Sequence, residues 1–115
     1  MTFAELIDAA EADGAAALRE ILRLARAASP EADEGVSYGV AALLHQGQPL
    51  IGIGTNAKGY ALFPFSGSVM SVVVDDLNGW RVTKGSVGFD GTKPLPSEVV
   101  ERIIGLRLAE IAQRK

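Results

Sequence analysis

The chain begins with two stretches that have the spacing of amphipathic helices. Apolar residues recur at every third or fourth position over residues 3–10 and again over residues 18–28, which predicts two helices. Thr2 and Glu5 have the T-x-x-E spacing of a capping box at the start of the first helix. Ser29-Pro30 ends the second helix, because the residue before a proline is disfavoured in the α region.

The middle of the chain changes to short, strand-like segments separated by turn residues. These segments predict an antiparallel sheet of about five strands, at residues 41–46, 49–55, 60–63, 80–83 and 86–89. The first two strands form a hairpin that turns at Gly47-Gln48. Residues 66–77 fit a helix by their apolar spacing and a strand by their run of valines. We take them as an inserted helix that Ser66 or Ser68 caps.

The carboxy-terminal stretch has the pattern of one more helix. Its apolar stripe runs from Val100 to Ile111, and Ser97 is the expected cap. The predicted fold class is therefore α+β, with the N-terminal helices, the inserted helix and the C-terminal helix packed on an antiparallel sheet. The 115 residues suit a single domain over residues 1–115.

Glycines alternate with isoleucines in the second strand of the predicted hairpin. Ile51 and Ile53 point to one side of the sheet, whereas Gly52 and Gly54 point to the other. The missing side chains predict that a helix, a backbone segment or a ligand approaches the glycine side closely. Residues 52–57 also match G-x-G-x-x-G/A, but a dinucleotide site needs that motif between a strand and a helix. Here it leads into another strand, so packing is the preferred interpretation.

Composition narrows the classes of function. The net charge of −3 and the pI near 5.1 argue against a general nucleic-acid or anionic-membrane binder. The absence of cysteine excludes disulfides and thiolate metal sites. No apolar run approaches the length of a membrane span, and the first residues lack the pattern of a signal peptide. The expectation is a cytoplasmic protein with no membrane and no nucleic acid as partner.

The single histidine limits the catalytic chemistry. A histidine-based triad or metal site would have to use His45, and no residue of suitable spacing accompanies it. We therefore expect a solvent-facing histidine on a strand. Since the sequence contains no recognisable nucleophile–base pair or phosphate-binding loop, it predicts a non-enzymatic protein without catalytic residues.

Aromatic and basic residues of the predicted sheet are candidates for a binding pocket. Tyrosines have polar tips and line pockets as well as cores. With the two glycines and the basic residues nearby, they predict a site for a small anionic ligand or a partner protein. The candidate ligand-binding residues are Tyr38, Gly52, Gly54, Lys58, Tyr60, Lys84 and Arg107.

Carboxylates are concentrated near the amino terminus and around residues 31–34. Oxygen ligands are the chemistry that Mg²⁺, Ca²⁺ and Fe²⁺ require. No calcium-loop spacing is present, and a solvated helix face explains residues 5–13 equally well.

Four short motifs resemble the bacterial YdhG-like domain family. Pro30-Glu31-Ala32 followed by Val36-Ser37-Tyr38-Gly39 is similar to its PEA…(I/V)SYGMP signature. Residues 84–89 resemble its KGT(I/L)RF segment, residues 93–96 its KPLP segment, and residues 107–110 its R-x-x-E. The order and spacing agree over residues 14–112. Two departures stand out: Val40-Ala41 replaces Met-Pro, and Gly88 stands where the family usually has arginine or lysine beside Lys84.

This resemblance implies an α+β fold and one specific function. One branch of the family is described as a frataxin-like iron chaperone, which implies Fe²⁺ delivered to iron–sulfur or haem assembly proteins. The motif implies metal ligation by Glu31, Asp33 and Glu34, whereas Glu5 and Asp8 are added by their chemistry alone. Exposed oxygen ligands without histidine or thiolate would hold Fe²⁺ weakly. The oligomeric state is left open.

Overall fold

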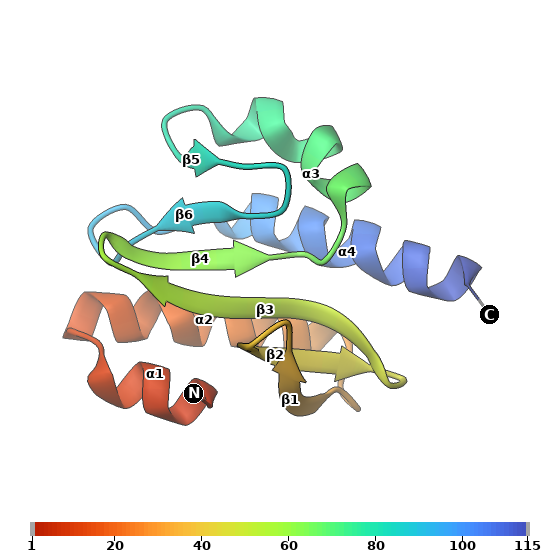
Figure 1. The fold of residues 1–115 in the computed structure, drawn as a ribbon, viewed down its shortest axis with the longest axis horizontal. Coiled ribbons are helices and arrows are strands. Elements are labelled where there is room, and N and C mark those ends of the chain that lie inside the picture. Colours follow the sequence, from red (N-terminus) through yellow and green to blue (C-terminus); the bar gives the residue numbers. More distant parts are fainter. Residues whose placement is uncertain (1, 115) are drawn as a thin grey trace.

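Six strands form one antiparallel sheet in the computed structural model, which describes residues 2–114 (Figure 1). The strands are β1 (Asp33–Ser37), β2 (Val40–His45), β3 (Gln48–Asn56), β4 (Gly59–Phe63), β5 (Arg81–Val82) and β6 (Val87–Phe89). Their order across the sheet is β1-β2-β3-β4-β6-β5. The α+β class is confirmed, with one strand more than the sequence predicted. The extra strand is β1, whose acidic residues and glycine are poor strand formers.

Two tight turns join the first three strands. Tyr38-Gly39 connects β1 to β2 with φ values of 50° and 79°, and Gln46-Gly47 connects β2 to β3 with 53° and 80°. Positive φ at both central residues is the requirement of a type I′ hairpin turn. The second turn lies one residue earlier than the predicted Gly47-Gln48.

Helices α2 (Ala12–Ala28) and α4 (Ser97–Gln113) lie behind the sheet in Figure 1. Helix α1 (Phe3–Ala9) begins with the predicted capping box, in which Glu5 N donates to Thr2 Oγ1 at 3.1 Å and Thr2 N donates to the Glu5 carboxylate at 2.8 Å. Residues 66–77 are helical as predicted. They form α3 (Gly67–Val73) and the 3₁₀ helix η1 (Val74–Leu77), with the Ser66 hydroxyl accepting from Val69 N.

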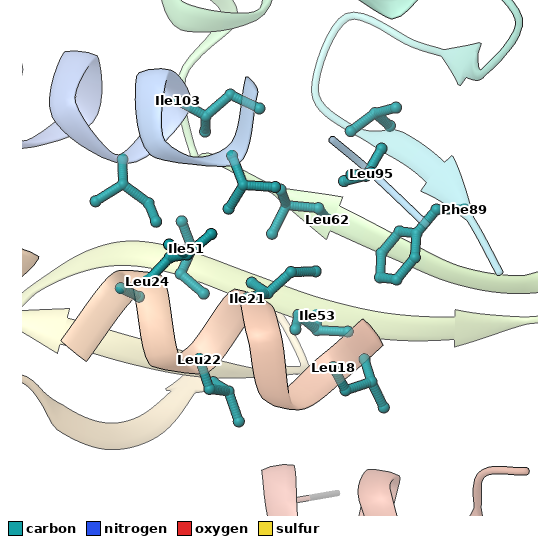
Figure 2. Close-up of a cluster of buried hydrophobic side chains, with 14 of the residues drawn as sticks. Leu18, Ile21, Leu22, Leu24, Ile51, Ile53, Leu62, Phe89, Leu95 and Ile103 are labelled. Atoms are coloured by element: carbon teal, nitrogen blue, oxygen red, sulfur yellow. The ribbon is translucent and has the colours of Figure 1, made fainter. Parts of the chain in front are cut away.

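The core lies between the sheet and the two long helices (Figure 2). Figure 2 shows Ile51, Ile53 and Leu62 of the sheet meeting side chains of α2 and α4, among them Ile21 and Ile103. All five are buried. The predicted placement of the isoleucines and glycines of β3 on opposite sides is confirmed, and the structure shows that the isoleucines face the helices. Within residues 2–114, no helix has both the length and the apolar character needed to cross a membrane.

Glu20 connects α2 to the first turn of α4. Its carboxylate accepts hydrogen bonds from Arg23 Nε at 2.7 Å and from Ser97 Oγ at 2.9 Å. The bond from Arg23, and then that from Ser97, lower the pKa of Glu20 to about 2 because both favour the ionised form. The expected cap role of Ser97 is wrong, since Pro96 is the N-cap and Ser97 is the first helical residue.

Candidate functional site

The side of the sheet opposite α2 and α4 is not covered by a helix over β3, β4 and β6 (Figure 1). Strand pairing sets Gly54 opposite Ala61, Ala61 opposite Gly88, and Gly88 opposite Arg81. Cross-strand partners share one face of a sheet, and alternate residues of a strand take opposite faces. These residues therefore lie on the side opposite Ile53, and we call this side the open face.

Side chains of the same chain approach the glycines of β3. A β-carbon at Gly52 would lie 2.7 Å from Phe65 Cζ, and one at Gly54 would lie 3.1 Å from Val40 Cγ1 and 3.3 Å from Phe63 Cε2. The glycine side is closely approached, as predicted, but by side chains and not by a helix, a backbone segment or a ligand. These apolar side chains can pack against the strand because glycine has no β-carbon, which would otherwise occupy the space.

Two adjoining depressions lie on the open face. The first, which we call the aromatic groove, has a volume of about 400 Å³ and is lined by Tyr38, Val40, Phe63, Phe65, Ser66, Gly67 and Gly85. The second has about 380 Å³, shares Val40 and Phe63, and passes over Gly54 and Ala61. The aromatic groove is lined mainly by apolar and aromatic side chains, whereas Thr55, Asn56 and Ser86 add polar groups to the second depression.

Tyr38 and Phe65 form the outer wall of the aromatic groove. Their rings are stacked, with centroids 5.9 Å apart and planes 27° apart. Both backbones are in the left-handed region, with φ of 50° at Tyr38 and 57° at Phe65. Bulky residues adopt positive φ rarely, and such strain costs about 1–3 kcal/mol per residue. The hairpin turn accounts for the positive φ of Tyr38. A tyrosine is nevertheless unusual at this position, because such a turn favours asparagine, aspartate or glycine.

Of the predicted ligand-binding residues, the structure brings Tyr38, Gly52 and Gly54 to the open face, with Gly52 beneath Phe65. Tyr60 faces the core, where its ring centroid lies 5.6 Å from that of Phe89.

The three basic candidates lie apart from one another. Arg107 is 2% exposed, and its guanidinium donates to Pro49 O at 3.0 Å and to Glu110 Oε1 at 3.2 Å. Lys84 lines a separate depression of about 600 Å³ against α3. Lys58 lies in the β3–β4 turn and lines a third depression with Arg81 of β5 and with Gly88 and Phe89 of β6. One anion site that combines these three cations is therefore not formed.

The predicted metal ligands are only partly brought together. Glu5 and Glu34 line one depression of about 230 Å³, while Asp8, Glu31 and Asp33 lie outside its lining. Glu5 is engaged in the capping box, and the backbone hydrogen bond from Thr2 lowers the pKa of its carboxyl. Glu34 pairs with Arg26 at 3.2 Å. In the described part of the chain, no three histidine, aspartate or glutamate side chains group closely enough to hold a metal ion.

The structure corrects the expectation for His45. This residue is half-buried, and its Nδ1 lies 2.7 Å from Ser29 Oγ. Ser29 is 2% exposed and follows the last turn of α2, so the bond joins the end of that helix to the end of β2. Neither residue lines a depression described above. We therefore interpret the pair as a structural contact, which the sequence concealed because 16 positions separate the two residues.

The architecture defines an α+β domain in which helices cover one face of an antiparallel sheet and leave the other open. The chain is similar throughout to the crystal structure of YdhG, a protein of the DUF1801 family from Bacillus subtilis. The TM-score is 0.80 at 18% sequence identity, over 96% of this chain and 91% of that one. The chain therefore has the YdhG-like fold that its motifs implied. No protein-family model matches the chain, and no curated protein matches it.

Proposed function

We propose that this chain is a non-enzymatic binding domain that holds the planar, apolar part of a small organic ligand in the aromatic groove. The observation that carries the proposal is the stacked pair of Tyr38 and Phe65, whose backbones are both left-handed while Tyr38 is 91% exposed. Folding gains little from an exposed ring at a position that prefers asparagine or glycine. A ligand stacked on the Tyr38 ring would give this exposed side chain a binding role.

The dimensions and chemistry of the groove support this proposal. Its volume of about 400 Å³ is within the range of about 300–1,000 Å³ that small-molecule sites occupy. Its walls are the rings of Tyr38, Phe63 and Phe65, and aromatic pairs contribute about 0.5–1.5 kcal/mol beyond the area they bury. The Tyr38 hydroxyl adds one hydrogen-bonding group at the rim.

A neutral fluorescent aromatic probe, N-phenyl-1-naphthylamine, tests this function. We expect saturable binding that Tyr38→Asn and Phe63→Leu each weaken about threefold to tenfold, the loss of one aromatic contact. Tyr38→Asn keeps the turn, since asparagine is favoured there, so its thermal stability should equal or exceed that of the parent. Val72→Ala, a change at a residue that is 47% exposed on α3 and outside the groove lining, is the matched control. Equal affinity in the parent and both groove variants would refute the proposal.

A second candidate function is the carriage of ferrous iron to iron–sulfur or haem assembly proteins. The observation in its favour is that Glu5 and Glu34 line the same depression. Two carboxylates are fewer than the roughly six oxygens that a hard cation takes, so water would complete the shell and binding would be weak. Both carboxylates would also have to leave their present partners.

Anaerobic calorimetry with Fe²⁺, and with Mg²⁺ as the comparison, tests this candidate. If it is right, the parent binds Fe²⁺ in preference to Mg²⁺, and the double variant Glu5→Gln, Glu34→Gln loses that preference. The matched double variant Glu31→Gln, Asp33→Asn, which lies outside the depression, should retain it. Iron binding that is unchanged in the first double variant would exclude this pair of carboxylates.

A further inference from the structure

A basic pocket lies on the open face near the β5 edge of the sheet. It has a volume of about 290 Å³ and is lined by Lys58, Gly79, Trp80, Arg81, Gly88, Phe89, Asp90 and Lys93. Three of its four charged residues are basic, although the whole chain carries a net charge of −3. The local charge therefore opposes that of the molecule as a whole.

Asp90 offsets only one of the three positive charges of this pocket, and one of its carboxylate oxygens is engaged within its own loop. Its Oδ1 accepts from Thr92 N at 2.8 Å, Thr92 Oγ1 at 2.6 Å and Lys93 N at 2.9 Å. The Thr92 hydroxyl, followed by the Lys93 amide, lowers the pKa of Asp90, so the residue stays ionised. One carboxylate against three cations leaves the pocket positive.

Arg81 lies across the floor of the pocket. A β-carbon at Gly88 would come 3.3 Å from Arg81 Nη2, so the guanidinium occupies the space that a longer side chain at position 88 would fill. Within residues 2–114, neither Arg81 nor Lys58 forms an ion pair. The planar guanidinium is suited to two parallel hydrogen bonds with a carboxylate or phosphate.

Lys93 and Trp80 hold each other in place at the side of the pocket. Lys93 Nζ donates to Gly79 O at 2.6 Å and lies 4.7 Å from the centroid of the Trp80 ring. Trp80 Nε1 donates to Lys93 O at 3.2 Å. This lysine is therefore positioned before any ligand arrives, which reduces the entropy lost on binding.

We infer that this pocket binds an oxyanion, the carboxylate or phosphate group of a small ligand, with Arg81 as the main contact and Lys58 and Lys93 in support. The inference deepens the proposed function and rests on it for the apolar part of the ligand. Gly88 pairs with Ala61 and Ala61 with Gly54, so the pocket adjoins the depression over β3. A ligand held at both places would combine a planar apolar group with an anionic group.

Amide and indole NMR signals of the ¹⁵N-labelled protein, titrated with inorganic phosphate and separately with acetate, test the pocket. We expect saturable shifts at Gly88 and at the Trp80 indole that weaken as salt is raised. Arg81→Gln should reduce the phosphate affinity at least tenfold, as expected when charge-assisted hydrogen bonds are lost. Lys84→Gln, a change at an exposed lysine of the adjacent turn outside the pocket lining, should change it less than twofold.

The two proposals fail in distinguishable ways. Arg81→Gln should leave the affinity for neutral N-phenyl-1-naphthylamine unchanged, whereas Tyr38→Asn should leave the phosphate titration unchanged. Phosphate shifts that are equal in the parent and in Arg81→Gln, or that spread evenly over exposed lysines, would overturn the oxyanion site and leave the aromatic groove standing. Acetate shifts without phosphate shifts would identify a carboxylate as the anionic group.

Discussion

Replacing Ile51 by alanine should lower the free energy of unfolding by about 2–5 kcal/mol, the range for truncating a fully buried isoleucine. Ile51 is 0% exposed and sits on β3, where Figure 2 shows it between the side chains of α2 and α4. Its loss leaves a cavity at the junction of three elements that cannot all move inward together. Urea unfolding followed by circular dichroism measures the change.

Two further variants make this prediction specific. Ile51→Val removes one methylene and should cost about 0.5–1.5 kcal/mol, a fraction of the alanine effect. Val72→Ala, at an exposed site, should change the stability by less than about 0.5 kcal/mol. If Ile51→Ala destabilised the protein no more than Val72→Ala, the packing of the Ile51 side chain against α2 and α4 would be wrong.

Replacing Glu110 by alanine should lower the free energy of unfolding by about 3 kcal/mol, the lower end for a broken buried ion pair. Arg107 is almost fully buried, and Glu110 is its only ion-pair partner within residues 2–114. Glu110 Oε2 also accepts a hydrogen bond from Ser66 Oγ at 2.8 Å, so the change loosens the N-cap of α3 as well. About a quarter of the Glu110 side chain is exposed, which allows water to replace part of the loss.

The matched variants separate charge from hydrogen bonding. Glu110→Gln keeps an acceptor oxygen for Arg107 and should cost less than the alanine change. Glu101→Ala, on the exposed side of the same helix and outside every ion pair described for residues 2–114, controls for helix propensity. Thermal unfolding of the three variants ranks them, and equal melting temperatures for Glu110→Ala and Glu101→Ala would contradict the proposed network.

The one-sided arrangement of helices links the fold to the candidate site. Because α2 and α4 both pack behind the sheet, the small residues of β3, β4 and β6 stay accessible on the other side (Figure 1). The rings at one end and the cations at the other then lie on a single surface. A ligand with an apolar and an anionic end would be recognised at both.

The sequence predicted the close packing on the glycine side of β3, but it wrongly grouped the basic side chains into one site. The alternation of Ile51 and Gly52 predicted that these residues take opposite sides of the strand, because neighbouring residues of a strand take opposite faces. The prediction that Lys58 and Arg107 line one site is wrong, because Arg107 is held behind the sheet. There its guanidinium donates to Pro49 O, 58 positions earlier in the chain. No local pattern marks that contact.

The sequence by itself determined the helix start at Thr2, the alternation in β3 and the α+β class, because these depend on residues a few positions apart. Only the tertiary structure decided the pairing of β1, the bond between Ser29 and His45, and the meeting of basic side chains over Gly88. The last two join residues far apart in the chain, and packing of the helices and the order of the strands bring them together. Strand β1 pairs through a local hairpin, but its acidic residues and glycine gave no strand pattern to read.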